Sequence, residues 1–172
     1  PHRRIYLTGS PMFEVLNENE EKINNSKILK KLNLKEKEYF IVSTHREENV
    51  DNENHLKQII STLNTLADNF NMPIIVSTHP RTKKRLEGLK NVKINKRIQF
   101  LKPFGFFDYV KLQKESLCAI SDSGTISEES AILSFPAISL RQSMERPEAQ
   151  DVGTIILTGF NKDIILNSIN TV

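Results

Sequence analysis

Short apolar runs rich in β-branched residues alternate with longer amphipathic patterns along this chain, and this alternation constrains the fold more than any other feature. The runs 39–44 and 73–78 have the length and composition of strands covered on both faces. Between them, residues 52–70 place apolar side chains at i, i+3, i+4 and i+7, which is one face of a helix. Strands that alternate with helices indicate βαβ units. We therefore predict an α/β fold with a Rossmann-like, doubly wound and mainly parallel sheet.

The same pattern continues on both sides of this unit. Because their content is largely apolar, we expect 39–44, 73–78 and 117–121 to be neighbouring interior strands. The charged segment 11–32 has the spacing of one or two helices, and no Gly- or Pro-rich linker divides the chain. The remaining expected strands are 5–8, 92–94, 98–101 and 136–140, and the remaining expected helices are 82–89, 107–114, 125–133 and 162–169.

Composition argues against several other classes of protein. The 172 residues carry a net charge of only +3, and the lysines are scattered without interleaved aromatic residues, so we expect no nucleic-acid partner. The apolar runs are too short for a transmembrane helix, and no signal peptide opens the chain. The single cysteine, Cys118, lies in an apolar run and is interpreted as a buried hydrophobe, not a nucleophile. We expect a cytoplasmic protein without a membrane partner, and Pro1 at the start indicates a piece of a longer chain.

Four polar segments each follow an expected strand, where doubly wound sheets bind their ligands. The segment from Ser121 to Ser130 carries the most information. Gly124 allows the backbone to approach a ligand closely. The first amides of the following helix have no partner within the helix, and together with the helix dipole they favour binding of a pyrophosphate. Ser123 and Thr125 add hydroxyl donors, and a glutamate one turn on can accept from ribose hydroxyls. The alternative is a simple helix cap with glutamates that face solvent. A serine nucleophile is disfavoured because the Gly-x-Ser-x-Gly elbow is absent. The four segments are 44–49, 78–82, 102–106 and 121–125.

Two histidines end strands after Ser-Thr pairs, and both should project from the same sheet edge. His45, followed by Arg46, and His79 therefore indicate a phosphate or sugar site, whereas a metal site lacks a third ligand at a recognisable spacing. Phe104 or its backbone can contact a base. Arg141 and Arg146 can hold a diphosphate, the alternative being an exposed charged loop. We interpret the other aromatic and histidine residues near these segments as core (Phe106, Phe107) or surface (His2, His55).

Together these segments resemble the non-hydrolysing UDP-N-acetylglucosamine 2-epimerase family. The resemblance implies the C-terminal half of a two-domain GT-B-type enzyme, with 1–172 as a single UDP-binding domain and 1–32 as a flanking helical part. The N-terminal domain, which holds the carboxylates proposed for proton transfer at C2, would be absent, so this chain alone should be inactive. The full-length enzyme is expected to be a homodimer that needs no cofactor. The matching stretches are 44–49, 77–80, 121–129 and 145–149.

The resemblance also implies roles for individual residues. His45 is expected beside the diphosphate, where its protonated form stabilises UDP as the leaving group of an elimination and re-addition that inverts C2. Ser123, Gly124 and Thr125 are expected at the phosphates, Glu129 at the ribose, and the backbone near Phe104 at the uracil. The expected UDP-binding residues are Arg46, His79, Phe104, Ser123, Gly124, Thr125, Glu129, Arg141 and Arg146.

Two departures from the usual family pattern indicate a branch. The family often has Gly-Gly where this chain has Gly124-Thr125, and an asparagine near the position of Arg81. These residues, with 9–12 and 102–108, look more like the enzymes that form UDP-N-acetyl-L-fucosamine from a 6-deoxy-L-talose derivative. The rival interpretations are the donor-binding domain of a GT-B glycosyltransferase and a nucleotide-sensing module without chemistry. The segments beginning at His45 and Glu145 favour the epimerase.

Overall fold

One parallel sheet organises the molecule. A computed structural model describes residues 6, 9–46, 51–89, 92–141, 155–159 and 161–171. In this part of the chain six strands form a single sheet in the order β3-β2-β1-β4-β5-β6, and every neighbouring pair is parallel. This order confirms the doubly wound fold and the expected interior position of β2, β1 and β4. The strands are β1 (Phe40–Ser43), β2 (Ile74–Ser77), β3 (Ile98–Leu101), β4 (Cys118–Ser121), β5 (Ala137–Ser139) and β6 (Ile155–Leu157).

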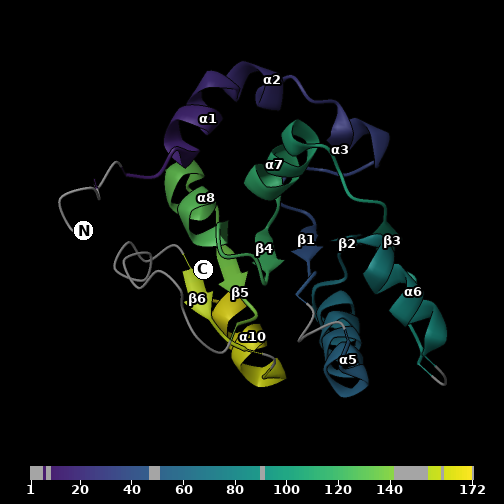
Figure 1. The fold of residues 1–172 in the computed structure, drawn as a ribbon. Helices are drawn as coiled ribbons and strands as arrows, with labels where there is room; N and C mark the ends of the chain where they lie inside the picture. Colours follow the sequence, from purple (N-terminus) through teal and green to yellow (C-terminus); the bar gives the residue numbers. More distant parts are fainter. Residues whose placement is uncertain are drawn as a thin grey trace.

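Helices cover both faces of the sheet (Figure 1). The face that Figure 1 turns downward is covered by α5 (Glu53–Phe70), α6 (Pro80–Gly88) and α10 (Lys162–Ile169). The opposite face is covered by α7 (Phe106–Glu115) and α8 (Ile126–Leu133). Three short helices arch over α7 and α8 and add buried Leu16 and Ile23 to this layer. They are α1 (Met12–Glu18), α2 (Glu20–Asn24) and α3 (Ile28–Lys31).

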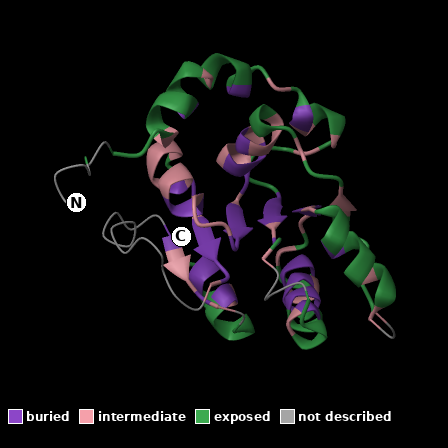
Figure 2. Cartoon of the chain, in the orientation of Figure 1, coloured by how far each residue is buried: buried purple, intermediate pink, exposed green. Residues whose placement is uncertain are grey.

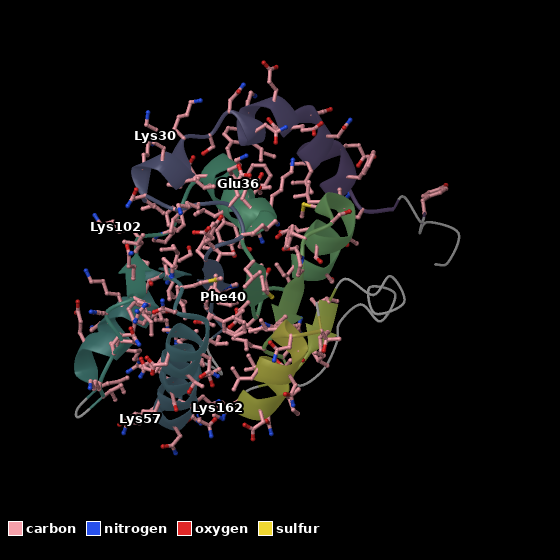
Figure 3. All side chains as sticks on the ribbon, turned by 180° about the vertical axis from the view of Figure 1, so that it is seen from behind. Lys30, Glu36, Phe40, Lys57, Lys102 and Lys162 are labelled. Atoms are coloured by element: carbon pink, nitrogen blue, oxygen red, sulfur yellow. The ribbon has the colours of Figure 1, made fainter. Side chains whose placement is uncertain are left out.

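The core follows the two-residue period of the strands. In β1, Phe40 and Val42 pack toward α5 and α10, whereas Ile41 packs toward α7 and α8. Figure 2 shows the buried interior strands between the two helical layers, with α6 largely exposed and α8 half-buried. In Figure 3, Phe40 lies inside this layer, while the labelled lysines reach outward at separate places on the periphery. These lysines are Lys30, Lys57, Lys102 and Lys162.

Cys118 is confirmed as a core residue. Its side chain is buried in the cluster under α5 and α10, and burial raises the pKa of the thiol to about 12. The thiol therefore stays protonated at neutral pH and is a poor nucleophile. Within the described ranges no helix has the length and apolarity to cross a bilayer.

Several sequence predictions were wrong in detail. The segment 11–32 forms three helices, not one or two, and 92–94 is no strand. There the side chain of Asn64 donates to the Lys93 carbonyl at 2.7 Å and accepts from the Asn95 amide at 2.8 Å, so an amide side chain replaces a strand partner. The edge strand β6 was not predicted, because three residues are too few to show a period. Most of the expected strand 5–8 lies outside the described residues.

The N-cap of α5 fixes where the loop after β1 turns into its helix. The Asn52 side chain accepts from the amides of Asn54 and His55. We expect Asn52→Ala to lower the free energy of unfolding by about 1 kcal/mol, the usual cost of losing such a cap. For a chain of this size the melting temperature should fall by about 2–4 °C. Asn54→Ala is the matched control, and equal melting temperatures for the two variants would contradict the assignment.

Candidate functional site

The strand order places a topological switch point, and with it the expected binding crevice, between β1 and β4. From β1 the chain winds outward through β2 to β3, and from β4 it winds the other way through β5 to β6. Ligands of doubly wound sheets bind outside the carboxyl ends of the strands at such a switch point. The strands end level with one another, since Ser43 pairs in register with Ser77 and Ser121, and Ser121 with Ser139. The polar segments that follow β1 and β4 therefore start side by side.

A buried carboxylate joins the two sides of this crevice. Asp122 is fully buried and accepts from the backbone amides of His45 at 3.2 Å and Arg46 at 3.1 Å. Nδ1 of His45 lies 3.3 Å from Oδ1 of Asp122, and Nε of Arg46 donates to the Asp122 carbonyl at 3.0 Å. The side chain of His45 is 52% exposed, so Asp122 holds one side of the ring while the rest stays accessible to a ligand. Asp122 thus fixes the loop that carries both residues.

Sequence reasoning missed the role of Asp122. Its only signal was an acidic residue placed directly after an apolar strand, inside the Ser121 to Ser130 segment. Its partners lie 76 and 77 positions earlier in the chain, so no local pattern indicates them.

A chain of hydrogen bonds orders the turn after β4. The Ser121 hydroxyl accepts from the Ser123 amide at 3.1 Å, and the Ser123 hydroxyl accepts from the Thr125 amide at 3.3 Å. The hydroxyls of Ser123 and Thr125 lie 3.0 Å apart. Thr125 occupies the N-cap position of α8, but its side chain makes no capping bond. The hydroxyl of Thr125 instead donates to Oε1 of Glu129 at 2.8 Å.

The two adjacent glutamates of α8 point to different partners. Oε2 of Glu129 accepts from Nε2 of Gln113 on α7 at 2.6 Å, so this carboxylate is held between the turn and α7. Glu128 accepts instead from the Ser10 hydroxyl at 2.9 Å, toward the N-terminal helices. The alternative in which both glutamates simply face solvent therefore fails for Glu129.

Tyr109 of α7 lies near the carboxyl ends of β1 and β4. The side chains of Ser43 and Ser121, the last residues of these strands, partly offset the effect of burial on the pKa of its phenol. Burial holds the pKa of this phenol above its usual range, so the hydroxyl stays protonated. Its ring packs against the core under α7 and α8. The helical spacing of 107–114 does not indicate where the oxygen of this phenol lies.

The candidates on the β2 and β3 side occupy separate positions. His79 is the N-cap of α6, and its Nδ1 accepts from the Arg81 amide at 3.3 Å. Phe104 is half-buried against the core under α7. The prediction that Phe106 and Phe107 are core residues was wrong, because they open α7 with 44% and 38% of their surfaces exposed.

Arg141 lies on the β5 and β6 side of the switch point. It follows β5 and lines a pocket of about 620 Å³ with His55, Gln58, Thr158 and others. Among the described residues of this lining, Arg141 is the one candidate from the sequence, and none of them belongs to the turn after β4. His55 was predicted to be a surface residue but is half-buried beside this pocket.

Arg146 and His2 lie outside the described residues. Gly124 lies in the turn after β4, between Ser123 and Thr125. In the described part of the chain, no three His, Cys, Asp or Glu side chains are close enough to hold a metal ion.

The parallel sheet and the polar residues at its switch point define a Rossmann-like α/β domain. The family profile of UDP-N-acetylglucosamine 2-epimerase matches residues 1–172. A UDP-N-acetylglucosamine 2-epimerase of Methanocaldococcus jannaschii is 34% identical over 172 residues, covering 96% of this chain and 47% of that protein. The chain belongs to the UDP-N-acetylglucosamine 2-epimerase family.

Solved structures agree with this assignment. A UDP-N-acetylglucosamine 2-epimerase from Rickettsia bellii is 46% identical with a TM-score of 0.85, covering 95% of this chain and 43% of that one. The Methanocaldococcus jannaschii enzyme in complex with UDP-GlcNAc and UDP is 33% identical with a TM-score of 0.89, covering 99% and 48%. The chain thus spans about half the length of the relatives that it matches.

Proposed function

We propose that the full-length protein is a UDP-N-acetylamino-sugar 2-epimerase and that this chain is its UDP-binding domain, with residues 1–32 as a flanking part. The observation that carries the proposal is the carboxylate of Glu129, held at the first turn of α8 beside the sheet's switch point. A carboxylate there accepts from the two hydroxyls of a ribose, while the helix N-terminus attracts the attached diphosphate.

The turn after β4 is the proposed phosphate cradle. The hydroxyls of Ser123 and Thr125 and the backbone at Gly124 lie at the N-terminus of α8, where the helix dipole favours negative charge. Arg46, tied to the Asp122 carbonyl, adds a cation on the β1 side. The uracil then extends toward the loop at Phe104, and Arg141, Arg146 and His79 complete the proposed set around the diphosphate and the sugar.

His45 is the proposed catalytic residue of this half. In the reaction, C2 of the sugar loses its proton, the C1–O bond breaks anti to it, and UDP leaves with the bonding electrons to give a glycal. A protonated imidazole beside the diphosphate donates to the departing oxygen and stabilises its charge. UDP then adds back to C1, and C2 receives a proton on the opposite face. The acid and base at C2 come from the N-terminal domain of the same polypeptide, across a GT-B-type cleft.

The substrate is proposed to be either a UDP-N-acetylglucosamine-type sugar or the precursor of UDP-N-acetyl-L-fucosamine. Two residues that indicated the second branch make side-chain contacts. Thr125 donates a hydrogen bond to Glu129, and Arg81 forms an ion pair with Asp51. The hydrogen bond from Arg81 holds the pKa of the Asp51 carboxyl below its usual range. Turnover of the two UDP-sugars by the full-length protein distinguishes the branches.

A homodimeric, cytoplasmic enzyme completes the proposal. The one cysteine is a buried thiol, which suits a reducing compartment. The family match supports an epimerase over a glycosyltransferase or a sensor that shares the fold.

The test of the proposed site is UDP binding to the 172-residue chain by calorimetry. Because hydrogen bonds to charged groups contribute about 1.5–3 kcal/mol each, Glu129→Ala should weaken UDP binding about tenfold or more. Pyrophosphate binding should change far less, since pyrophosphate has no ribose. UDP binding by the chain alone is expected to be weak, and epimerisation undetectable, because half of the cleft is absent.

Glu128→Ala is the matched control, since the neighbouring carboxylate points toward Ser10. It should bind UDP as the unaltered chain does. Equal UDP affinity in Glu129→Ala and Glu128→Ala would remove Glu129 from the site, and inversion at C2 by this chain alone would refute the assignment of the acid and base to the other half.

A further inference from the structure

Gln113 is a polar side chain in an apolar place. It lies on α7 with 1% of its surface exposed. Of the buried side-chain nitrogens and oxygens that the structure describes, its Oε1 alone has no hydrogen-bond partner. A buried amide with an unmade hydrogen bond is unfavourable for folding. A side chain of the same volume without polar atoms would avoid this cost, so the residue type calls for another explanation.

The other end of the amide supplies that explanation. Nε2 of Gln113 donates to Oε2 of Glu129 at 2.6 Å, and the opposite amide orientation would place an oxygen against a carboxylate oxygen. The Thr125 hydroxyl donates to the second carboxylate oxygen, Oε1, at 2.8 Å. Each oxygen of the Glu129 carboxylate therefore accepts one hydrogen bond from the protein.

This arrangement suits a ligand with two adjacent donors. Each carboxylate oxygen has two lone pairs, so each can accept a second hydrogen bond after its protein donor is counted. The 2′- and 3′-hydroxyls of a ribose are adjacent donors, and a carboxylate held in one orientation accepts both together. A carboxylate that rotates freely would accept the two hydroxyls together less often. Binding would then have to order the side chain, which weakens the affinity.

We infer that Gln113 is a positioning residue that orients Glu129 toward both ribose hydroxyls and so makes the site selective for ribonucleotides over deoxyribonucleotides. This inference rests on the proposed function of Glu129. Gln113 is buried behind the carboxylate, so it acts through Glu129 and not through a contact of its own with the ligand. Its effect is therefore confined to ligands that carry the ribose diol.

Gln113→Met removes the donor and keeps a similar volume. UDP binding should weaken about tenfold, which corresponds to about 1.4 kcal/mol. Binding of pyrophosphate should stay within about twofold, and the preference for UDP over 2′-deoxy-UDP should shrink. The melting temperature should stay the same or rise, because the unpaired Oε1 disappears. A purely structural glutamine would show the reverse, a lower melting temperature with unchanged ligand preference.

Two comparisons isolate the effect. Gln99→Met makes the same change at an exposed position of β3 and should leave UDP binding unaltered. The double variant Gln113→Met/Glu129→Ala should bind UDP no more weakly than Glu129→Ala alone, since the two residues act through one carboxylate.

The outcomes separate the two claims. Unchanged UDP binding in Glu129→Ala overturns the proposed ribose contact and this inference with it. Weakened binding in Glu129→Ala with unchanged binding and ribose preference in Gln113→Met overturns the inference alone. If Gln113→Met does not fold, nuclear magnetic resonance of the unaltered chain decides. The side-chain amide signals of Gln113 should then shift on addition of UDP and not of pyrophosphate, and signals that do not move with UDP overturn the inference.

Discussion

His45→Asn in the full-length protein is expected to lower kcat about 10²–10³-fold, because losing one preorganised donor to a developing negative charge has a cost of that size. The imidazole is anchored by the contact of Nδ1 with Asp122, and its half-exposed side chain faces the crevice where UDP is proposed to depart. Asparagine preserves a polar side chain at this position but carries no positive charge. Turnover is measured as the exchange of the two C2 epimers, followed by nuclear magnetic resonance.

UDP affinity provides the control for this variant. A residue that acts mainly on the departing charge should change the affinity for UDP by no more than about fivefold while kcat falls by far more. A kcat within threefold of the unaltered enzyme would show that His45 does not stabilise the leaving group. A loss of UDP binding as large as the loss of kcat would show a uniform binding role.

Asp122→Ala is expected to lower the free energy of unfolding of the 172-residue chain by about 3 kcal/mol. The substitution leaves the amides of His45 and Arg46 without their carboxylate acceptor at the start of the loop after β1. Both residues are partly accessible to water, which keeps the cost near the lower end for hydrogen bonds to a charged group. The melting temperature should fall by about 6–12 °C. Urea denaturation gives the free energy directly.

Asp163→Ala is the control for the loss of a negative charge. Asp163 is exposed in the first turn of α10, and its replacement should change stability by less than about 0.5 kcal/mol. Asp122→Asn keeps one acceptor oxygen and should fall between the two. If Asp122→Ala were as stable as Asp163→Ala, the hydrogen bonds that cross the switch point would contribute nothing to folding.

The local pattern of the chain determined the elements and the class of fold. The spacing of apolar residues differs between the runs that form β1, β2 and β4 and the amphipathic segment that forms α5. This spacing reflects the local backbone geometry, which is determined within each segment. The position of the polar segments followed as well, because parallel strands bring their carboxyl ends to one edge. The turn at Ser123 and the carboxylate of Glu129 were therefore identifiable as site candidates before any contact was known.

Where such reasoning failed, the deciding partner lay elsewhere in the chain. The segment 92–94 had strand-like residues, but the side chain of Asn64 on α5 binds the Lys93 carbonyl and the adjacent Asn95 amide in place of a strand partner. Phe106 and Phe107 were apolar enough for the core, yet the first turn of α7 leaves them at the surface, where Lys22 lies 5.5 Å from the Phe107 ring. Burial depends on what packs against a residue, and composition does not supply that.

The sequence by itself thus determined the interior strands, the longer helices and the edge at which polar side chains gather, because these depend on short-range periodicity and on the direction of parallel strands. Only the tertiary structure decided which side chains meet there. Asp122 binds the loop of His45, and Gln113 binds Glu129 from a different helix. A hydrogen bond needs its two atoms within about 3 Å in a suitable direction, and for residues far apart in the chain that condition is set by the packing of whole elements.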